Sequence, residues 1–172
     1  GVSTGTNNAF PELREPTITG LAVGLAVTGQ VPSDLAYSFN KRIEVLVNDK
    51  REIALVDAAV VTERYIGARA IWKTENFRDL FVTFGRPDGI GMSSIVGLLD
   101  PLDRDTPEGR RVNLLPLEEA KVILAAPIAP GLIENVGIGA VETLKPDQHY
   151  KPSVSVGSFA LDGERELTFS EI

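Results

Sequence analysis

Residues 78–97 read RDLFVTFGRPDGIGMSSIVG, and the rest of the chain is organised around this stretch. A predicted apolar strand at 80–84 leads into a glycine-rich loop, which closes on paired serines before the sequence turns apolar again. Glycine adopts backbone conformations closed to other residues and lets a second molecule approach the main chain. Two interpretations remain open. One is a polar pocket built from backbone N–H groups, the two hydroxyls and Asp88 or Arg86; the other is an ordinary connecting loop, which the spacing alone favours.

The composition describes a folded domain and excludes several classes of function. The 172 residues suffice for one domain or one large part of a bigger protein, and 43% are hydrophobic, an ordinary share for a globular core. The net charge of −7 argues against a surface for nucleic acid or anionic membrane. Without cysteine the chain has no disulfide and no cysteine chemistry, which fits a reducing cytoplasm. The single histidine, His149, lies in a polar stretch and is expected at the surface.

The longest apolar stretch and the first residues of the sequence are also informative. The longest apolar stretch, 18–27, is too short for a membrane span and is interrupted by threonine and glycine. The chain begins with Gly1 rather than methionine, and the context of a myristoylation signal is absent. The first residues, GVSTGTNNAFP, are typical of a loop that follows a strand. We therefore expect a fragment whose upstream strand is not in this sequence.

One helix followed by many short strands is the predicted order of elements. Pro16 and Thr17 open a helix over 17–28, and Gly29 and Pro32 close it. Alternation and turn residues predict a hairpin of 42–47 with 53–61, and further strands at 65–72, 79–84, 97–100, 122–126, 136–143, 153–161 and 164–169. A charged loop at 101–109, one helical turn at 114–120 and a proline-fixed corner at 127–132 connect them. This spacing predicts a mainly β sandwich or barrel at 34–172, preceded by a junction segment at 1–33.

Asp57 stands within the strand predicted at 53–61, IALVDAAVV, which is otherwise apolar on both faces. A buried carboxylate in such a run needs a partner or a ligand. Alternatively, it caps a strand end that faces solvent. The sequence leaves both interpretations open.

Several segments occur in the order and spacing of one protein family. They are GVSTGTNNAFP at the start, IALVDAAVV at 53–61, the loop of 78–97, APIAPGL at 126–132 and ALDGEREL at 160–167. With this ordered set the chain resembles the C-terminal part of the ATP-NAD kinase superfamily, most closely its AcoX-like (acetoin catabolism) branch. The resemblance covers essentially the whole chain.

The resemblance implies a fold and an activity. It implies a NAD kinase-like C-terminal β-sandwich domain with one N-terminal helix, a companion α/β domain, and nucleotide bound in the cleft between them. The implied reaction is phosphorylation of the 2′-hydroxyl of NAD to give NADP, with ATP and Mg²⁺. The family's GGDGT motif, whose aspartate serves as the base, is absent from these residues and is expected upstream of Gly1. No catalytic residue is therefore expected in this chain, which alone lacks half of the cleft.

The resemblance also assigns binding residues one by one. Asp57 stands where the family has the glutamate of an Asn-Glu pair, and Val56 replaces the asparagine. Asp79 matches an acidic residue before the loop, and Ser94 matches a serine within it. The remaining residues expected at the pocket or near the junction with the companion domain are Gly89, Gly91, Ser93, Asn7 and Asn8.

The match departs from the NAD kinases on the acceptor side. The family's Thr-Ala-Tyr is not retained around 89–91, so an aromatic stacking partner is missing. Gly131 stands where those enzymes often carry histidine, and Asp162-Gly163-Glu164 is more similar to the hairpin of related lipid kinases. Three functions follow: the acceptor-binding half of a NAD kinase, a kinase for another small alcohol linked to acetoin breakdown, or a non-catalytic ligand-binding or assembly module. The expected partners are a small-molecule nucleotide and further copies of the chain, joined through the β domain.

Overall fold

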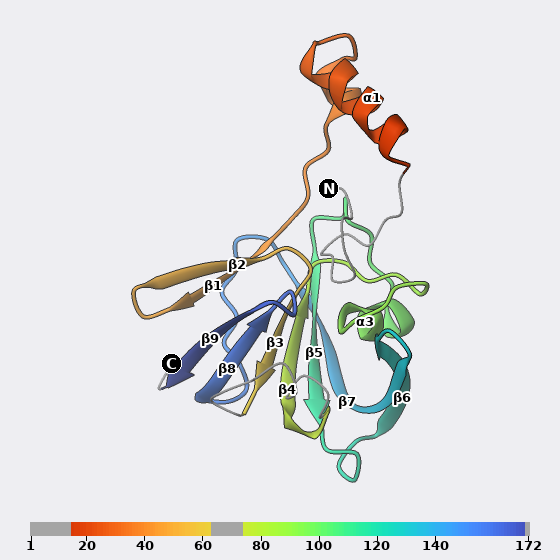
Figure 1. Cartoon of the computed structure of the whole chain (residues 1–172). Helices are drawn as coiled ribbons and strands as arrows, with labels where there is room; N and C mark the ends of the chain where they lie inside the picture. The colour runs from red at the N-terminus through yellow and green to blue at the C-terminus, as the bar shows by residue number, and fades with distance from the viewer. Residues whose placement is uncertain (1–14, 63–73, 171–172) are drawn as a thin grey trace. The chain divides into compact units, whose positions relative to one another are not determined.

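The computed structural model describes residues 15–62 and 74–170, in two compact units that divide after Asn40 (Figure 1). The first unit contributes α1 (Pro16–Val27) and the short α2 (Ser33–Ala36). The second contributes the strands β1 to β9, the 3₁₀ turn η2 (Thr74–Asn76) and α3 (Ser93–Leu99). The strand predicted at 65–72 lies outside the described residues.

Helix α1 confirms the helix predicted over 17–28. The side chain of Glu15 accepts a hydrogen bond of 3.0 Å from the Ile18 N–H, and Pro16 occupies the first turn. At the other end Gly29 is left-handed, with φ of +69°, and the helix stops. The helix is apolar on every side and buries none of its residues within its own unit; Val27, for example, is 75% exposed.

The second unit is built on an antiparallel sheet. In the described part of the chain the strand order is β6-β7-β5-β4-β3-β8-β9, and β1 and β2 form a separate two-stranded hairpin. The bounds are β1 Ile43–Val47, β2 Lys50–Ala54, β3 Asp57–Val61, β4 Phe77–Val82, β5 Gly109–Leu115, β6 Val122–Ala129, β7 Leu132–Leu144, β8 Val156–Leu161 and β9 Arg165–Ser170. A mainly β fold is thereby confirmed.

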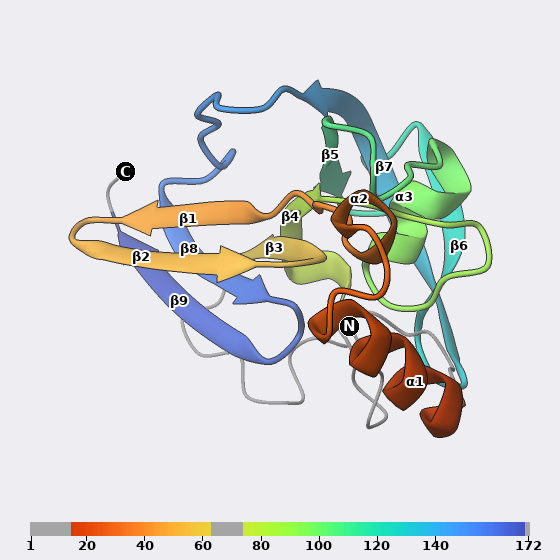
Figure 2. The same ribbon diagram turned by 90° about the horizontal axis from the view of Figure 1, so that it is seen from above.

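The large sheet carries one apolar core on each face. Because side chains alternate along a strand, β3 sends Ala59 and Val61 into one core and Ala58 and Val60 into the other. The first core is closed by α3, which lies beside β6 in both views (Figures 1 and 2). The second core is closed by the β1–β2 hairpin, which crosses β8 and β9 (Figure 2). We call these the helix face and the hairpin face.

Two local predictions are wrong for physical reasons. Residues 97–100 were expected to continue the strands but belong to α3 and its end, because a short apolar run is compatible with either a strand or a helix. Residues 114–120 were expected to form a helical turn. Leu114 and Leu115 instead pair with β7 as the end of β5, and the chain turns only after Pro116.

The strand predicted at 53–61 is interrupted. It breaks at Leu55 and Val56 into β2 and β3, because the N–H groups of both residues turn to the side chain of Asp162. Asp57 therefore begins a strand instead of lying in the middle of one.

The glycines that flank the loop allow the chain to pack on itself. A side chain on Gly97 would overlap the carbonyl group of Arg86, and one on Gly85 would lie 2.6 Å from the carbonyl oxygen of Ser93. These two glycines serve the contact between α3 and its own preceding loop.

Lys41 joins the start of the second unit to the 101–109 loop. Its Nζ donates to the backbone carbonyl oxygens of Asp103 at 2.8 Å, Arg104 at 3.2 Å and Thr106 at 2.6 Å. One ammonium group thus gathers three carbonyls of a loop that the sequence analysis described only as charged.

Candidate functional site

Asp57 lies on the helix face of the sheet, at the point where β3 begins. It shares that face with Ala59 and Val61, and it pairs with Val82 of β4. The residue as a whole is partly exposed, whereas its carboxyl group is enclosed by protein. Burial, helped by the nearby carboxyl of Asp162, raises the pKa of Asp57 to about 7, and a hydrogen bond from the Ser93 backbone N–H opposes the rise. Asp57 is therefore close to half ionised at neutral pH.

Asp162 lies in the turn between β8 and β9 and reaches across to the turn between β2 and β3. Its Oδ1 accepts hydrogen bonds from the N–H groups of Leu55 at 3.0 Å, Val56 at 2.8 Å and Asp57 at 3.2 Å. Its own N–H donates to the carbonyl oxygen of Asp57 at 3.0 Å. The two turns are thus fixed to each other at the start of β3.

The 85–92 loop meets the end of β6, where the proline-fixed corner predicted at 127–132 is instead a hairpin between β6 and β7. The Gly91 N–H donates to the Pro127 carbonyl oxygen at 3.0 Å, and the Ser94 hydroxyl donates to the same oxygen at 3.4 Å. Gly91 has φ of +94°, with open space where a side chain would stand. Gly89 instead contacts its own loop, since its N–H donates to the Arg86 carbonyl oxygen at 3.0 Å. Residues predicted from separate segments thus gather around the start of α3.

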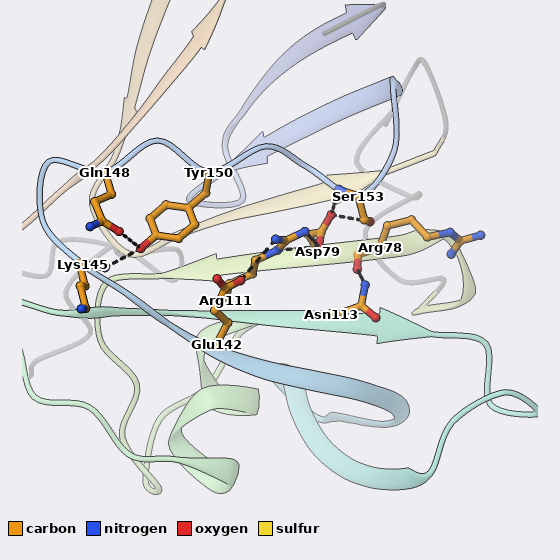
Figure 3. Close-up of polar contacts among 9 residues, drawn as sticks. All are labelled: Arg78, Asp79, Arg111, Asn113, Glu142, Lys145, Gln148, Tyr150 and Ser153. Atoms are coloured by element: carbon orange, nitrogen blue, oxygen red, sulfur yellow. Dashed lines mark hydrogen bonds and ion pairs between the residues drawn. The ribbon is translucent and has the colours of Figure 1, made fainter.

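Asp79 belongs to the opposite face of the sheet. It lies two residues from Phe81 of the hairpin-face core, and it is completely buried. Its Oδ1 accepts from Arg111 Nη2 at 2.8 Å and Nε at 3.0 Å, and its Oδ2 accepts from Ser153 N at 2.6 Å and Oγ at 2.7 Å (Figure 3). The structure therefore does not bring Asp79 together with Asp57, and all of these acceptor positions serve the protein itself.

The contacts of Asp79 belong to a polar network that holds the segment 145–155 against the sheet. The Tyr150 hydroxyl accepts from the Lys145 N–H at 2.9 Å and donates to Gln148 at 3.0 Å (Figure 3). Arg111 also pairs with Glu142 at 3.4 Å. Sequence reasoning missed both partners of Asp79, because Arg111 and Ser153 are distant in sequence and carry no local motif.

Asp162 was also missed as a site residue, although its turn was recognised. The available signal was the Asp-Gly pair, since aspartate tolerates the left-handed conformation that Asp162 adopts at φ of +51°. Asn7 and Asn8 lie outside the described residues. His149 is exposed, as expected.

Within residues 15–62 and 74–170, no three histidine, aspartate or glutamate side chains are grouped to hold a metal ion. In the same residues no helix is long and apolar enough to cross a membrane. A carboxyl group that is partly ionised at neutral pH can accept a hydrogen bond from a hydroxyl group.

Comparison with known proteins adds a family match. The model of the family described as "Acetoin catabolism protein X C-terminal domain" matches residues 41–172. Acetoin catabolism protein X of Cupriavidus necator is 46% identical to the chain over 174 residues, which cover 98% of the chain and 48% of that protein. The chain thus spans about half the length of this curated relative. No solved structure matches the chain.

Proposed function

The chain belongs to the family of acetoin catabolism protein X C-terminal domains, and on that premise we propose that it forms the acceptor-binding part of an ATP-dependent, NAD kinase-like enzyme of acetoin catabolism. In this reaction the terminal phosphoryl group of ATP passes to a ribose hydroxyl of NAD and gives NADP. In this proposal the base is a GGDGT aspartate that the present chain does not contain. The role of the present chain is to bind and orient the acceptor.

The observation that supports this role is the enclosed carboxyl group of Asp57, whose pKa of about 7 leaves it able to accept or donate a hydrogen bond at neutral pH. Phosphoryl transfer depends mainly on positioning, so a residue that orients the acceptor hydroxyl contributes directly to rate. Ser93, the first residue of α3, donates its backbone N–H to this carboxyl group, and Gly91 lies two residues before it in the sequence.

The other predicted residues have supporting positions in this proposal. Ser94 and Gly89 fix the loop through their hydrogen bonds to the carbonyl oxygens of Pro127 and Arg86. Asp79 stabilises the hairpin face of the sheet, opposite the face that carries Asp57. In this proposal Mg²⁺ enters with ATP, whose phosphates supply part of its coordination.

The test is a nucleotide kinase assay on the chain joined to the upstream half that its relative carries. We expect NADP to form from NAD, ATP and Mg²⁺, and we expect Asp57→Asn to raise the KM for the acceptor about tenfold or more, the effect of losing one hydrogen bond to a charged group. Asp147→Asn, at an exposed turn, is the matched control and should leave KM unchanged. Absence of phosphorylated nucleotide with any acceptor, in a folded protein, would refute the proposal.

A second candidate acceptor is a small alcohol linked to acetoin breakdown. The specific observation in its favour is Ile90, an aliphatic residue that is 41% exposed between Gly89 and Gly91, where a nucleotide base would gain from an aromatic ring. In a panel of diols and hydroxy ketones, transfer to one of them without transfer to NAD would favour this candidate. A rise in melting temperature with NAD would count against it, since a ligand that binds the folded state stabilises it.

Assembly into a homo-oligomer through the β domain is part of the same proposal. It is supported by β6, which lies at the end of the strand order and exposes Val122 and Ile123 by 51% and 55%. Light scattering on the purified protein tests it, and a monomer at micromolar concentration would exclude this mode of assembly.

A further inference from the structure

We propose that Asp162 is a positioning residue for Asp57: its carboxylate fixes the backbone from which Asp57 projects and places a second acidic group beside the acceptor. The proposal rests on the function proposed above, because it assigns Asp162 a part in preparing the group that meets the acceptor hydroxyl. Asp162 itself makes no contact with substrate in this assignment.

The geometry is that of a carboxylate enclosed by one turn. Three successive N–H groups, at residues 55, 56 and 57, point to Oδ1 of Asp162 at 2.8 to 3.2 Å, and Oδ2 accepts a second contact of 2.9 Å from Leu55. The return bond, from the Asp162 N–H to the Asp57 carbonyl oxygen, fixes the same peptide from the other side. The backbone of Asp57 is therefore held at both its N–H and its carbonyl.

The turn that carries Asp162 favours this direction of the side chain. Asp162 and Gly163 have φ of +51° and +69°, the combination of a tight hairpin turn between β8 and β9. The rigid turn places the carboxylate about a hundred positions away in sequence from the N–H groups that it accepts. A loose loop would not hold it there.

A purely structural cap does not require a negative charge. Asparagine or serine would accept the same N–H groups and would avoid placing a second carboxylate near the enclosed carboxyl of Asp57. The second carboxylate raises the pKa of Asp57 and so keeps that residue partly protonated at neutral pH. Asp162 thus acts on Asp57 in two ways, by fixing its backbone and by opposing its ionisation.

Among residues 15–62 and 74–170, Arg165 is the charged side chain that pairs with one of these two carboxyl groups. Arg165 of β9 lies 3.8 Å from Asp162 Oδ2. On the loop before α3, Arg86 and Asp88 pair with each other at 3.0 Å and are largely exposed. From α3 itself the group that meets Asp57 is the uncharged N–H of Ser93.

The test replaces the charge of Asp162 and keeps its shape. Asp162→Asn retains an oxygen for the three N–H groups, and asparagine tolerates the left-handed turn. Carboxyl NMR of the 172-residue chain should show the pKa of Asp57 falling by about one unit in this variant, as expected when one neighbouring carboxylate is neutralised. The matched control is Asp147→Asn, because Asp147 is also left-handed, with φ of +57°, but exposed, and it should leave Asp57 unchanged.

Kinase assays separate this inference from the proposed function. In the longer protein, the acidic limb of the acceptor kcat/KM profile should move to lower pH by the same amount in Asp162→Asn. If Asp57 titrates in a folded Asp162→Asn variant as it does in the wild type, the assignment of Asp162 is refuted. If the titration shifts and no acceptor is phosphorylated by the wild type, the coupling of the two residues is supported and the proposed reaction alone fails.

A measurement on the wild type covers the case in which the variant does not fold. The amide proton of Val56, bonded to Asp162 at 2.8 Å, should change its chemical shift with the same midpoint as the Asp57 carboxyl. An amide shift that stays constant through that titration would overturn the proposal.

Discussion

Replacement of Asp57 by asparagine should stabilise the fold above neutral pH and leave it unchanged in acid. Asparagine preserves the size of the side chain and an oxygen for the Ser93 N–H, but it carries no charge. The enclosed carboxylate is costly because burial and the carboxyl of Asp162 both disfavour its ionised form. The variant removes that cost.

The magnitude follows from the pKa of Asp57, which rises from 3.8 to about 7 in the folded chain. The difference is about 3 units, each worth about 1.4 kcal/mol, so the ionised carboxyl costs the folded state about 4 kcal/mol. The sign is set by proton binding. The folded state holds the proton more tightly than the unfolded state, so wild-type stability falls as pH rises from about 4 to about 7 and then levels off.

Denaturant unfolding followed by circular dichroism measures the effect. We expect the free energies of unfolding of Asp57→Asn and wild type to agree near about pH 4 and to differ by about 4 kcal/mol near about pH 8, with the variant more stable. Asp147→Asn, at an exposed position, should follow the wild type throughout. A difference that does not depend on pH, or a variant that is less stable at about pH 8, would refute the reasoning.

Three further substitutions test other parts of the second unit and of α1. Arg111→Leu leaves the fully buried Asp79 without its cation and should lower the free energy of unfolding in denaturant by about 3–5 kcal/mol. The control Arg42→Leu, from an exposed ion pair, should change it by less than about 1 kcal/mol. Equal effects of the two variants would show that the Asp79 network is not structural. Gly97→Ala should cost about 1–3 kcal/mol because its methyl group would overlap the Arg86 carbonyl, and an unchanged melting temperature would contradict the close packing of α3. Gly24→Ala, in open space on α1, should raise helical circular dichroism and stabilise the helix by about 1 kcal/mol, and a loss of helix would contradict the description of that position.

Helix ends and most strands could be predicted from the sequence because neighbouring residues mark them. The start and end of α1 are marked by Pro16 and Gly29, and most strands by alternation and turn residues. The prediction of a strand at 97–100 was wrong because a short, mainly apolar run fits either a helix or a strand, and these residues belong to the end of α3. What decides for a helix is the close contact at Gly97, which joins parts of the chain that the sequence does not show as neighbours.

The candidate site could be predicted only in part, since it depends on strand phase and on distant partners. The sequence left open whether the Asp57 carboxylate needs a partner or caps a strand end that faces solvent. Asp162, which fixes the backbone of Asp57, is 105 positions away. The family resemblance grouped Asp79 with Asp57, although the two point to opposite faces of the sheet. A difference of one residue in strand phase decides the face, and the resemblance does not define that phase. The partners of Asp79, 32 and 74 positions away, show its structural role only in three dimensions.

The three carbonyl bonds of Lys41 have a mechanical consequence. Tension that enters the second unit along the chain reaches Lys41 before it reaches the first paired residue of β1, Ile43. Part of that load passes through the ammonium group to the 103–106 loop, and so around the β1–β2 hairpin. A shortened chain that begins after residue 41 would lose this path, so its hairpin should open at lower force than that of a chain that keeps Lys41.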